Sequence, residues 1–196
     1  MARTNRERTD TTRAALIAAA RALFVEKGYA ATSTPEIVAA AGITRGALYH
    51  HFEDKRALFR AVVEEEMRQV AEEIERAAPA ADDARAALVA GSEAYLAAMT
   101  VTGRTRLMLV DGPAVLGVAE ALALDQAWAG RTLREGLAAA LDSRLAPPLT
   151  IAALATLLSA AFDRAALAID AGDDPRAIRA AMVDLIESTV TRGERG

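Results

Sequence analysis

The chain has no cysteine and few aromatic residues, and both shortages limit what it can be. Without cysteine, neither disulfide bonds nor thiolate metal sites can form, which agrees with a cytoplasmic protein. Aromatic residues make up 4% of the 196 residues whereas 53% are hydrophobic, so Ala, Leu, Val and Ile must build the core. This composition favours close packing of helices in one or two small domains.

Signals for catalysis and for membrane insertion are also missing. The only histidines, His50 and His51, are adjacent and would diverge by about 100° on a helix, so they cannot form a two-ligand metal face. The rest of the chain offers no histidine for a catalytic triad, and no glycine-rich phosphate loop follows a strand. The first residues, MARTNRERTD, are too polar for a signal peptide, and we expect no run that approaches a membrane span. We therefore expect no enzyme, no metal, no cofactor and no membrane.

The net charge of -4 conceals an uneven distribution. Residues 1–60 carry 10 Lys+Arg against 6 Asp+Glu, hence +4, and the remainder of the chain carries -8. A polyanion would be attracted to the N-terminal end and repelled elsewhere, as an oriented duplex-binding domain requires. Four of the basic residues precede or begin the first expected helix, either as an arm that contacts phosphates or as a solvated tail: Arg3, Arg6, Arg8 and Arg13.

The stretch TSTPEIVAAAGITRGALYHHF carries the signals of two short helices joined by a sharp turn. Ser33 followed by Glu36 forms a capping box that predicts a helix start. Gly42 predicts the end of that helix, because glycine tolerates the positive φ common after a helix. Thr44 is a natural N-cap for a second helix, Arg45–His51. The pattern predicts a helix-turn-helix whose second helix can enter a major groove.

Apolar residues recur at helical spacing along the rest of the chain, and no strand pattern appears. Residues 150–171 are apolar nearly all round, so this helix needs two neighbours, one of which is reasonably a second subunit. The pattern predicts an all-α fold, with an N-terminal three-helix helix-turn-helix domain followed by a C-terminal helical bundle. The other expected helices span residues 11–27, 55–77, 83–100, 102–110, 118–144 and 175–191, with stops at Asp111-Gly112-Pro113 and at Pro147-Pro148.

The run G-I-T-R-G-A-L-Y-H-H-F-x-D-K-x-A-L resembles the DNA-binding domain of the TetR (tetracycline-repressor-like) family. The resemblance implies a DNA-binding domain over residues 10–70, with its motif at 33–52. It also implies a C-terminal domain over residues 80–194 that binds a ligand and dimerises through the last two helices. Pro35 and Ala47 depart from the residues common in the family, so base readout is expected to be sparse.

The expected DNA contacts lie on and around the second helix of the motif. Arg45, in its first turn, is the candidate base reader, because arginine can bind guanine O6 and N7 together. Tyr49 could instead pack partly into the core, and His51 could be structural. The full set comprises Ser33, Thr34, Thr44, Arg45, Gly46, Tyr49, His50, His51 and Lys55.

The candidate ligand-binding residues are the large, adaptable or polar side chains of the middle helices. They would suit a largely apolar small molecule held by few polar contacts, although each is also an ordinary core residue. The set comprises Tyr95, Met99, Met108, Asp111, Trp128, Thr132, Phe162 and Asp163.

These features together predict a DNA-binding transcriptional regulator. The favoured form is a homodimeric repressor on a palindromic operator in double-stranded DNA, released by a small-molecule effector, because one such module makes few specific contacts. Three alternatives remain from the sequence: a ligand-dependent activator of the same fold, a sequence-tolerant architectural DNA-binding protein, and a purely helical enzyme or carrier.

Overall fold

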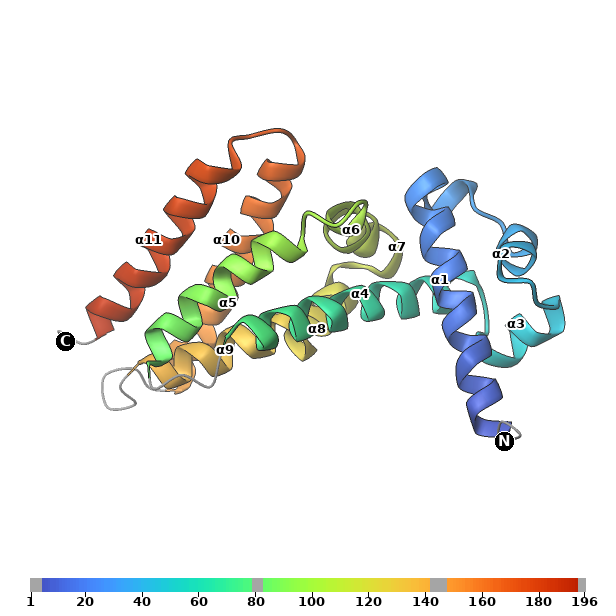
Figure 1. Ribbon diagram of the computed structural model, residues 1–196, viewed down its shortest axis with the longest axis horizontal. Helices are drawn as coiled ribbons and strands as arrows, with labels where there is room; N and C mark the ends of the chain where they lie inside the picture. The colour runs from blue at the N-terminus through green and yellow to red at the C-terminus, as the bar shows by residue number, and fades with distance from the viewer. Residues whose placement is uncertain (1–4, 79–82, 142–147, 194–196) are drawn as a thin grey trace. The chain divides into compact units, whose positions relative to one another are not determined.

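The structure is a computed structural model that describes residues 5–78, 83–141 and 148–193. Helices make up nearly all of the described residues and no strand occurs among them, which confirms the all-α prediction (Figure 1). The chain divides into two compact units. The N-terminal unit comprises Met1–Glu66 and Arg106–Ala121, and the C-terminal unit comprises Met67–Thr105 and Leu122–Gly196.

The N-terminal unit begins with a three-helix arrangement. Its helices are α1 (Asn5–Ala31), α2 (Thr34–Ala41), α3 (Arg45–His51), the start of α4 (Lys55–Ala77), the π-helical turn η1 (Leu107–Asp111), α7 (Gly112–Leu116) and the start of α8 (Val118–Ala127). Leu16, Phe24, Ile37, Leu48 and Phe59 are fully buried, so each of the first four helices contributes to one core. This core fixes α2 and α3 as a rigid pair.

Helix α1 departs from its expected limits at both ends. It starts at Asn5 rather than Thr11, and its hydrogen-bonded ladder continues to Ala31 across a break at Gly28, whose φ of 80° is not helical. The predicted end at Gly28 therefore corresponds to a kink. Of the basic residues expected near its start, Arg3 and the side chains of Arg6 and Arg8 lie outside the described residues.

The C-terminal unit is a helical bundle. It contains the end of α4, α5 (Ala84–Ala98), the end of α8, α9 (Ala129–Ala140), α10 (Pro148–Asp170) and α11 (Pro175–Gly193), with α6 (Arg104–Arg106) at its edge. Helix α5 packs against α9, α10 and α11, and α10 packs in addition against α9 and α11. Leu96, Leu137, Phe162 and Ile186 are buried where these helices meet.

Two expected helix limits are wrong. The stop at Asp111-Gly112-Pro113 does not occur, because η1 passes directly into α7 with Gly112 in helical conformation and Pro113 in the first turn. The single helix expected over 118–144 is broken at Trp128 (φ −120°, ψ −100°) into α8 and α9, and residues 142–144 lie outside the described residues. Pro148 begins α10, as proline can in a first turn.

The expectation that no run approaches a membrane span is also wrong. Thr150–Asp170, most of α10, has a mean hydropathy of 1.5 and is long and apolar enough to cross a membrane. This is weak evidence for insertion, because core helices of water-soluble proteins pass the same test.

Candidate nucleic-acid interface and internal cavity

Local hydrogen bonds define the start and the end of α2. The Ser33 hydroxyl accepts from the Glu36 amide at 3.4 Å, and the Glu36 carboxylate accepts from the Ser33 amide at 2.9 Å, so the predicted capping box is present. Lys27 donates to Glu36 at 2.8 Å and, with the Ser33 bonds, lowers the pKa of Glu36 to about 2. Gly42 ends α2 with a φ of 66°, as predicted.

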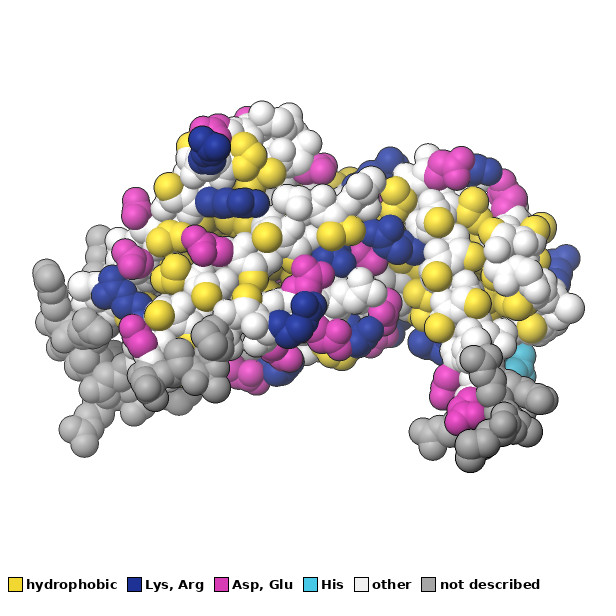
Figure 2. Space-filling view, viewed as in Figure 1, with side chains coloured by type: hydrophobic (Ala, Val, Ile, Leu, Met, Phe, Trp, Pro, Cys, Tyr) yellow, Lys and Arg dark blue, Asp and Glu magenta, His cyan; other side chains and the backbone are white. Residues whose placement is uncertain are grey.

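Helix α3 presents one polar side to solvent. Thr44 caps it by accepting from the Ala47 amide at 3.2 Å, while Leu48 is fully buried against the core. The exposed residues on its outer side are Arg45, Gly46, Tyr49 and His50. Histidine surface emerges at this end of the N-terminal unit in Figure 2, in keeping with the exposure of His50.

Arg45 and Tyr49 form a pair one helical turn apart. The Arg45 guanidinium lies 5.6 Å from the centre of the Tyr49 ring, and the Tyr49 side chain remains 44% exposed rather than packed into the core. Hydrogen bonds from Thr34 and then Arg45 lower the pKa of Tyr49. The pair and Thr34 therefore form one connected polar surface that spans α2 and α3.

Gly46 has no structural need to be glycine. Its backbone is not among those with positive φ, and a Cβ built there would find only the Thr44 hydroxyl, 4.0 Å away. Glycine weakens a helix relative to alanine. The missing side chain leaves the backbone of the first turn of α3 open to close approach from outside.

His51 and Lys55 are, like Thr34, only partly exposed, whereas the other candidates are exposed. His51 is half-buried, and burial, followed by His50 and Arg13, lowers its pKa. Lys55 donates to the carbonyl oxygens of Tyr29 and Thr32, each at 2.9 Å, and its ammonium lies 4.2 Å from the centre of the Tyr29 ring. Lys55 thus holds the C-terminal end of α1 against the start of α4.

Most of the cations between residues 21 and 60 are paired within the N-terminal unit. Arg21 binds Glu66 at 2.7 Å, and Lys27 binds Glu36. Arg56 and Arg60 both bind Glu120, at 2.7 and 2.8 Å. By contrast, Arg13 and Arg45 are exposed and each lies over an aromatic ring, Phe52 and Tyr49 respectively. Among the described side chains of the first 60 residues, the positive charge available to a partner therefore lies on fewer groups than the sequence indicates.

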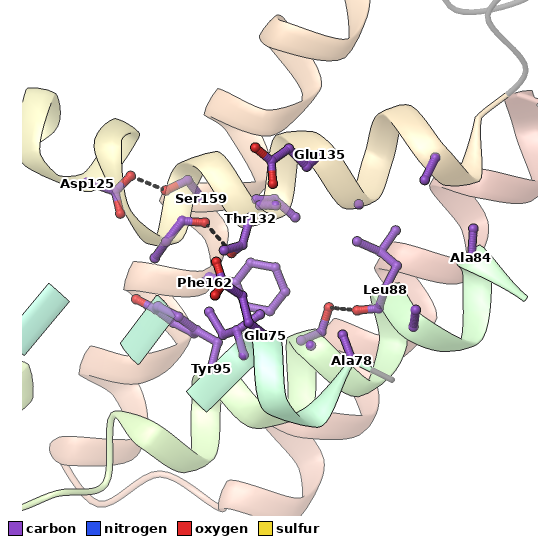
Figure 3. Close-up of a pocket in the computed structure, with 18 residues that line it drawn as sticks. Glu75, Ala78, Ala84, Leu88, Tyr95, Asp125, Thr132, Glu135, Ser159 and Phe162 are labelled. Atoms are coloured by element: carbon purple, nitrogen blue, oxygen red, sulfur yellow. Dashed lines mark hydrogen bonds between the residues drawn. The ribbon is translucent and has the colours of Figure 1, made fainter. Parts of the chain in front are cut away.

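A cavity of about 270 Å³ lies inside the C-terminal unit (Figure 3). Most of its wall is apolar, formed by the end of α4, by α5, α9 and α10, and by one residue of α8. Two glycines allow these helices to pack closely: a Cβ on Gly91 would lie 3.2 Å from Ile74, and one on Gly136 would lie 2.9 Å from Leu88. Its polar and aromatic lining residues are Glu75, Ser92, Tyr95, Asp125, Thr132, Glu135, Ser159 and Phe162.

Two carboxyl groups at the cavity accept hydrogen bonds from hydroxyls. Ser159 donates to Asp125 at 3.0 Å, and Tyr95 donates to Asp163 at 2.7 Å. Burial raises the pKa of Asp125. Burial and the nearby Asp125 together raise the pKa of Asp163 to about 6, although the hydrogen bond from Tyr95 opposes this. Burial, and then the nearby Asp163, raises the pKa of Tyr95 well above its ordinary value.

The predicted ligand-binding residues are only partly brought together. Tyr95, Thr132 and Phe162 line the cavity, and Asp163 lies behind Tyr95. Met99 instead lines a second cavity of about 240 Å³, and Trp128 precedes the lining residue Ala129. Met108 and Asp111 belong to the N-terminal unit. Sequence reasoning did not select Asp125 and Ser159, which are 34 residues apart and carry no shared motif.

A capped helix-turn-helix with an exposed second helix defines the class of protein: this is a helix-turn-helix DNA-binding protein. Residues 16–62 match the family model for bacterial regulatory proteins of the tetR family, and residues 85–192 match the tetracyclin repressor-like C-terminal domain. The chain belongs to the TetR family of transcriptional regulators.

Individual relatives agree with this assignment. The transcriptional repressor BepR of Brucella suis is 43% identical over 63 residues, which are 32% of this chain and 30% of BepR. The chain thus spans about a third of the length of such curated relatives. A TetR-family regulator from Pectobacterium atrosepticum has a solved structure that is 33% identical over 95% of both chains, with a TM-score of 0.68. LfrR from Mycobacterium smegmatis, solved in complex with proflavine, shares the fold at 23% identity over 91% of this chain and 96% of LfrR, with a TM-score of 0.61.

Proposed function

We propose that this chain is a homodimeric transcriptional repressor whose α3 enters the major groove of a palindromic operator. The observation that carries the proposal is the outer side of α3, where Arg45, Gly46, Tyr49 and His50 are exposed while Leu48 fixes the helix to the core. Capped at Thr44, the helix points its first turn outward, and this is the part of a recognition helix that contacts base edges. A DNA-binding domain over residues 10–70 would hold all of these groups.

Arg45 is assigned the base-reading role in each half-site. The Arg45 guanidinium is exposed and lies over the Tyr49 ring. Because this contact already restricts the Arg45 side chain, binding to guanine costs it less conformational entropy. Phosphate contacts are assigned to the hydroxyls of Ser33, Thr34 and Tyr49, to the cap at Thr44 and to the surrounding basic residues.

The remaining candidates have mixed roles in this proposal. Gly46 lets the DNA backbone approach α3, and His50 faces the phosphates. Lys55 uses two of its three N–H donors on the carbonyls of Tyr29 and Thr32, which leaves one for a phosphate. His51, half-buried, serves the packing of α3 as much as DNA.

Dimerisation through α10 and α11 would supply the second half-site contact. Leu157 of α10 is 69% exposed and Leu185 of α11 is 41% exposed, and burial of such side chains between two copies is favourable. Two recognition helices about one helical turn of DNA apart would then give the affinity that one module lacks.

A small molecule in the cavity of the C-terminal unit would release the operator. Support comes from the apolar cavity itself, from the match of residues 85–192 to the family's C-terminal domain, and from the ligand complex of LfrR. Ile74, Glu75 and Ala78, at or just beyond the end of α4, line the cavity, and the same helix begins next to α3. An effector that favours the non-binding state by roughly 10⁴-fold would shift the population almost completely. A cytoplasmic regulator without catalytic activity fits all of these features.

The test is DNA binding by the full chain and by one matched pair of variants. Fluorescence anisotropy with fragments of the DNA flanking its own coding region should identify an operator, with binding that weakens steeply with salt. Arg45→Ala should cost about 1–3 kcal/mol per half-site and relax sequence preference, since it removes the base contact. Arg134→Ala removes the same charge from an exposed position on α9 and should leave binding intact.

Equal loss in both variants would show that bulk charge, not α3, drives binding. Equal affinity for operator and random duplex would favour an architectural protein instead. An effector that strengthens rather than weakens operator binding would identify an activator.

A further inference from the structure

The cavity of the C-terminal unit has an acidic wall in which one carboxylate, that of Asp125, has no ion-pair partner among the described residues. Three carboxylates line it, Glu75, Asp125 and Glu135, and its described lining includes no lysine or arginine. Arg131 binds Glu75 at 2.6 Å and Glu135 at 3.1 Å, which compensates those two groups. The hydrogen bond to Asp125 comes from the neutral hydroxyl of Ser159.

A fourth carboxylate, that of Asp163, lies next to the lining residue Tyr95. Asp163 accepts from the Tyr95 hydroxyl at 2.7 Å, so the phenolic oxygen at the cavity is polarised toward negative charge. Asp125 and Asp163 repel each other, and burial disfavours the charge of both. In the free protein, the ionised forms of these two carboxylates are therefore destabilised. A positively charged ligand bound beside them would stabilise them.

The rest of the cavity wall is apolar and aromatic. Phe162 and Tyr95 meet edge to face with ring centres 5.4 Å apart (Figure 3). Leu88 and Ile74 also line the cavity. Aromatic faces attract cations, and the apolar surface accepts hydrocarbon. An anion would meet repulsion here, and a neutral molecule would leave the negative charge of Asp125 with only the hydrogen bond from Ser159.

We propose that the effector is a compact organic cation, whose positive group binds at Asp125 near the Tyr95–Asp163 pair and whose apolar part fills the space beside Phe162. This inference rests on the proposed function only in stating that the ligand controls DNA binding. Binding of the cation to the cavity can be measured without DNA. The volume of about 270 Å³ suits a small ligand, and a small aromatic or aliphatic ammonium combines the required positive charge with an apolar part.

The test compares two probes of the same shape that differ in charge. Benzyltrimethylammonium is a cation, and neopentylbenzene is its neutral carbon isostere. The full chain is titrated with each, with calorimetry and the emission of Trp128, the single tryptophan, as readouts. The cation should bind at least about tenfold more tightly than the neutral probe. This comparison needs only the unmodified protein, so it does not depend on any variant folding.

Three substitutions locate the charge effect. Asp125→Asn should abolish most of the preference for the cation, and Asp163→Asn should reduce it, because each removes negative charge while conserving side-chain size. Asp173→Asn, in the exposed turn between α10 and α11, removes the same charge away from the cavity and should change nothing.

Neutral probe binding as tight as the cation would overturn the inference, as would failure of both probes to bind or a preference that survives Asp125→Asn and Asp163→Asn. Operator binding is measured in parallel, so the two proposals fail separately. Release of DNA by the neutral probe would refute the claim that the effector is a cation. The claim that an effector binds in this cavity would still stand. Absence of DNA binding would refute the repressor, while the two titrations still decide the ligand class.

Discussion

Gly46→Ala should stabilise the protein while weakening its binding to DNA. Gly46 occupies the first turn of α3 in ordinary helical conformation, and the added methyl would have only the Thr44 hydroxyl near it, at 4.0 Å. Alanine is favoured over glycine inside a helix by about 0.5–1 kcal/mol. Because Gly46 lies near the helix start, we expect a gain of about 0.5 kcal/mol in the free energy of unfolding.

The effect on DNA should have the opposite sign. A methyl group at this exposed position would keep the DNA backbone from the first turn of α3 and remove close hydrogen bonds there. A hydrogen bond to a charged group is worth about 1.5–3 kcal/mol, so affinity should fall roughly 10-fold to 100-fold. Urea denaturation measures the first quantity, and fluorescence anisotropy with operator DNA measures the second.

Gly42→Ala is the matched control for the stability measurement. A Cβ there also finds open space, but the backbone φ of 66° is unfavourable for alanine. This variant should therefore lose about 1 kcal/mol of stability, because only its backbone is strained. If Gly46→Ala binds operator as tightly as the unmodified protein, the first turn of α3 does not approach DNA and the assignment of this surface is wrong.

Three further changes should separate structural from functional roles. Lys55→Ala removes the bonds to the carbonyls of Tyr29 and Thr32, so urea denaturation should show a loss of about 1–3 kcal/mol, whereas an unchanged midpoint would contradict the tie between α1 and α4. The pKa of Asp163 is raised from 3.8 to about 6 in the folded state, so its ionisation lowers stability as pH rises through that range. Asp163→Asn should therefore raise the free energy of unfolding by about 3 kcal/mol at pH 7.5 and have little effect below about pH 4, and a gain independent of pH would refute this cause. Leu157→Glu on α10 should shift the protein to monomers in sedimentation velocity and weaken operator binding, and an unchanged dimer would place the interface elsewhere.

The limits of the short helices follow from the sequence because their causes are local. Ser33 and Glu36 are three residues apart, Thr44 caps an amide three residues on, and Gly42 meets a backbone requirement of its own position. Such interactions form in the same way whatever surrounds them. The all-α fold and the family assignment depend on the same local regularities.

Tertiary packing decided the rest. The break at Trp128 overrides local signals that would continue a helix. The direct passage of η1 into α7 at Gly112 overrides signals that would stop one. Lys55 donates to carbonyl oxygens 23 and 26 residues away. These bonds give it a structural role that its position in the sequence motif does not reveal.

The sequence by itself determined that the chain is helical, where α2 and α3 begin, and which polar residue types α3 carries. Only the tertiary structure decided which polar groups share a cavity, since Tyr95 and Asp163 are 68 residues apart. The physical reason is that capping depends on neighbours along the chain, whereas burial, ion pairing and pKa depend on neighbours in space. Those neighbours exist only once the helices have packed.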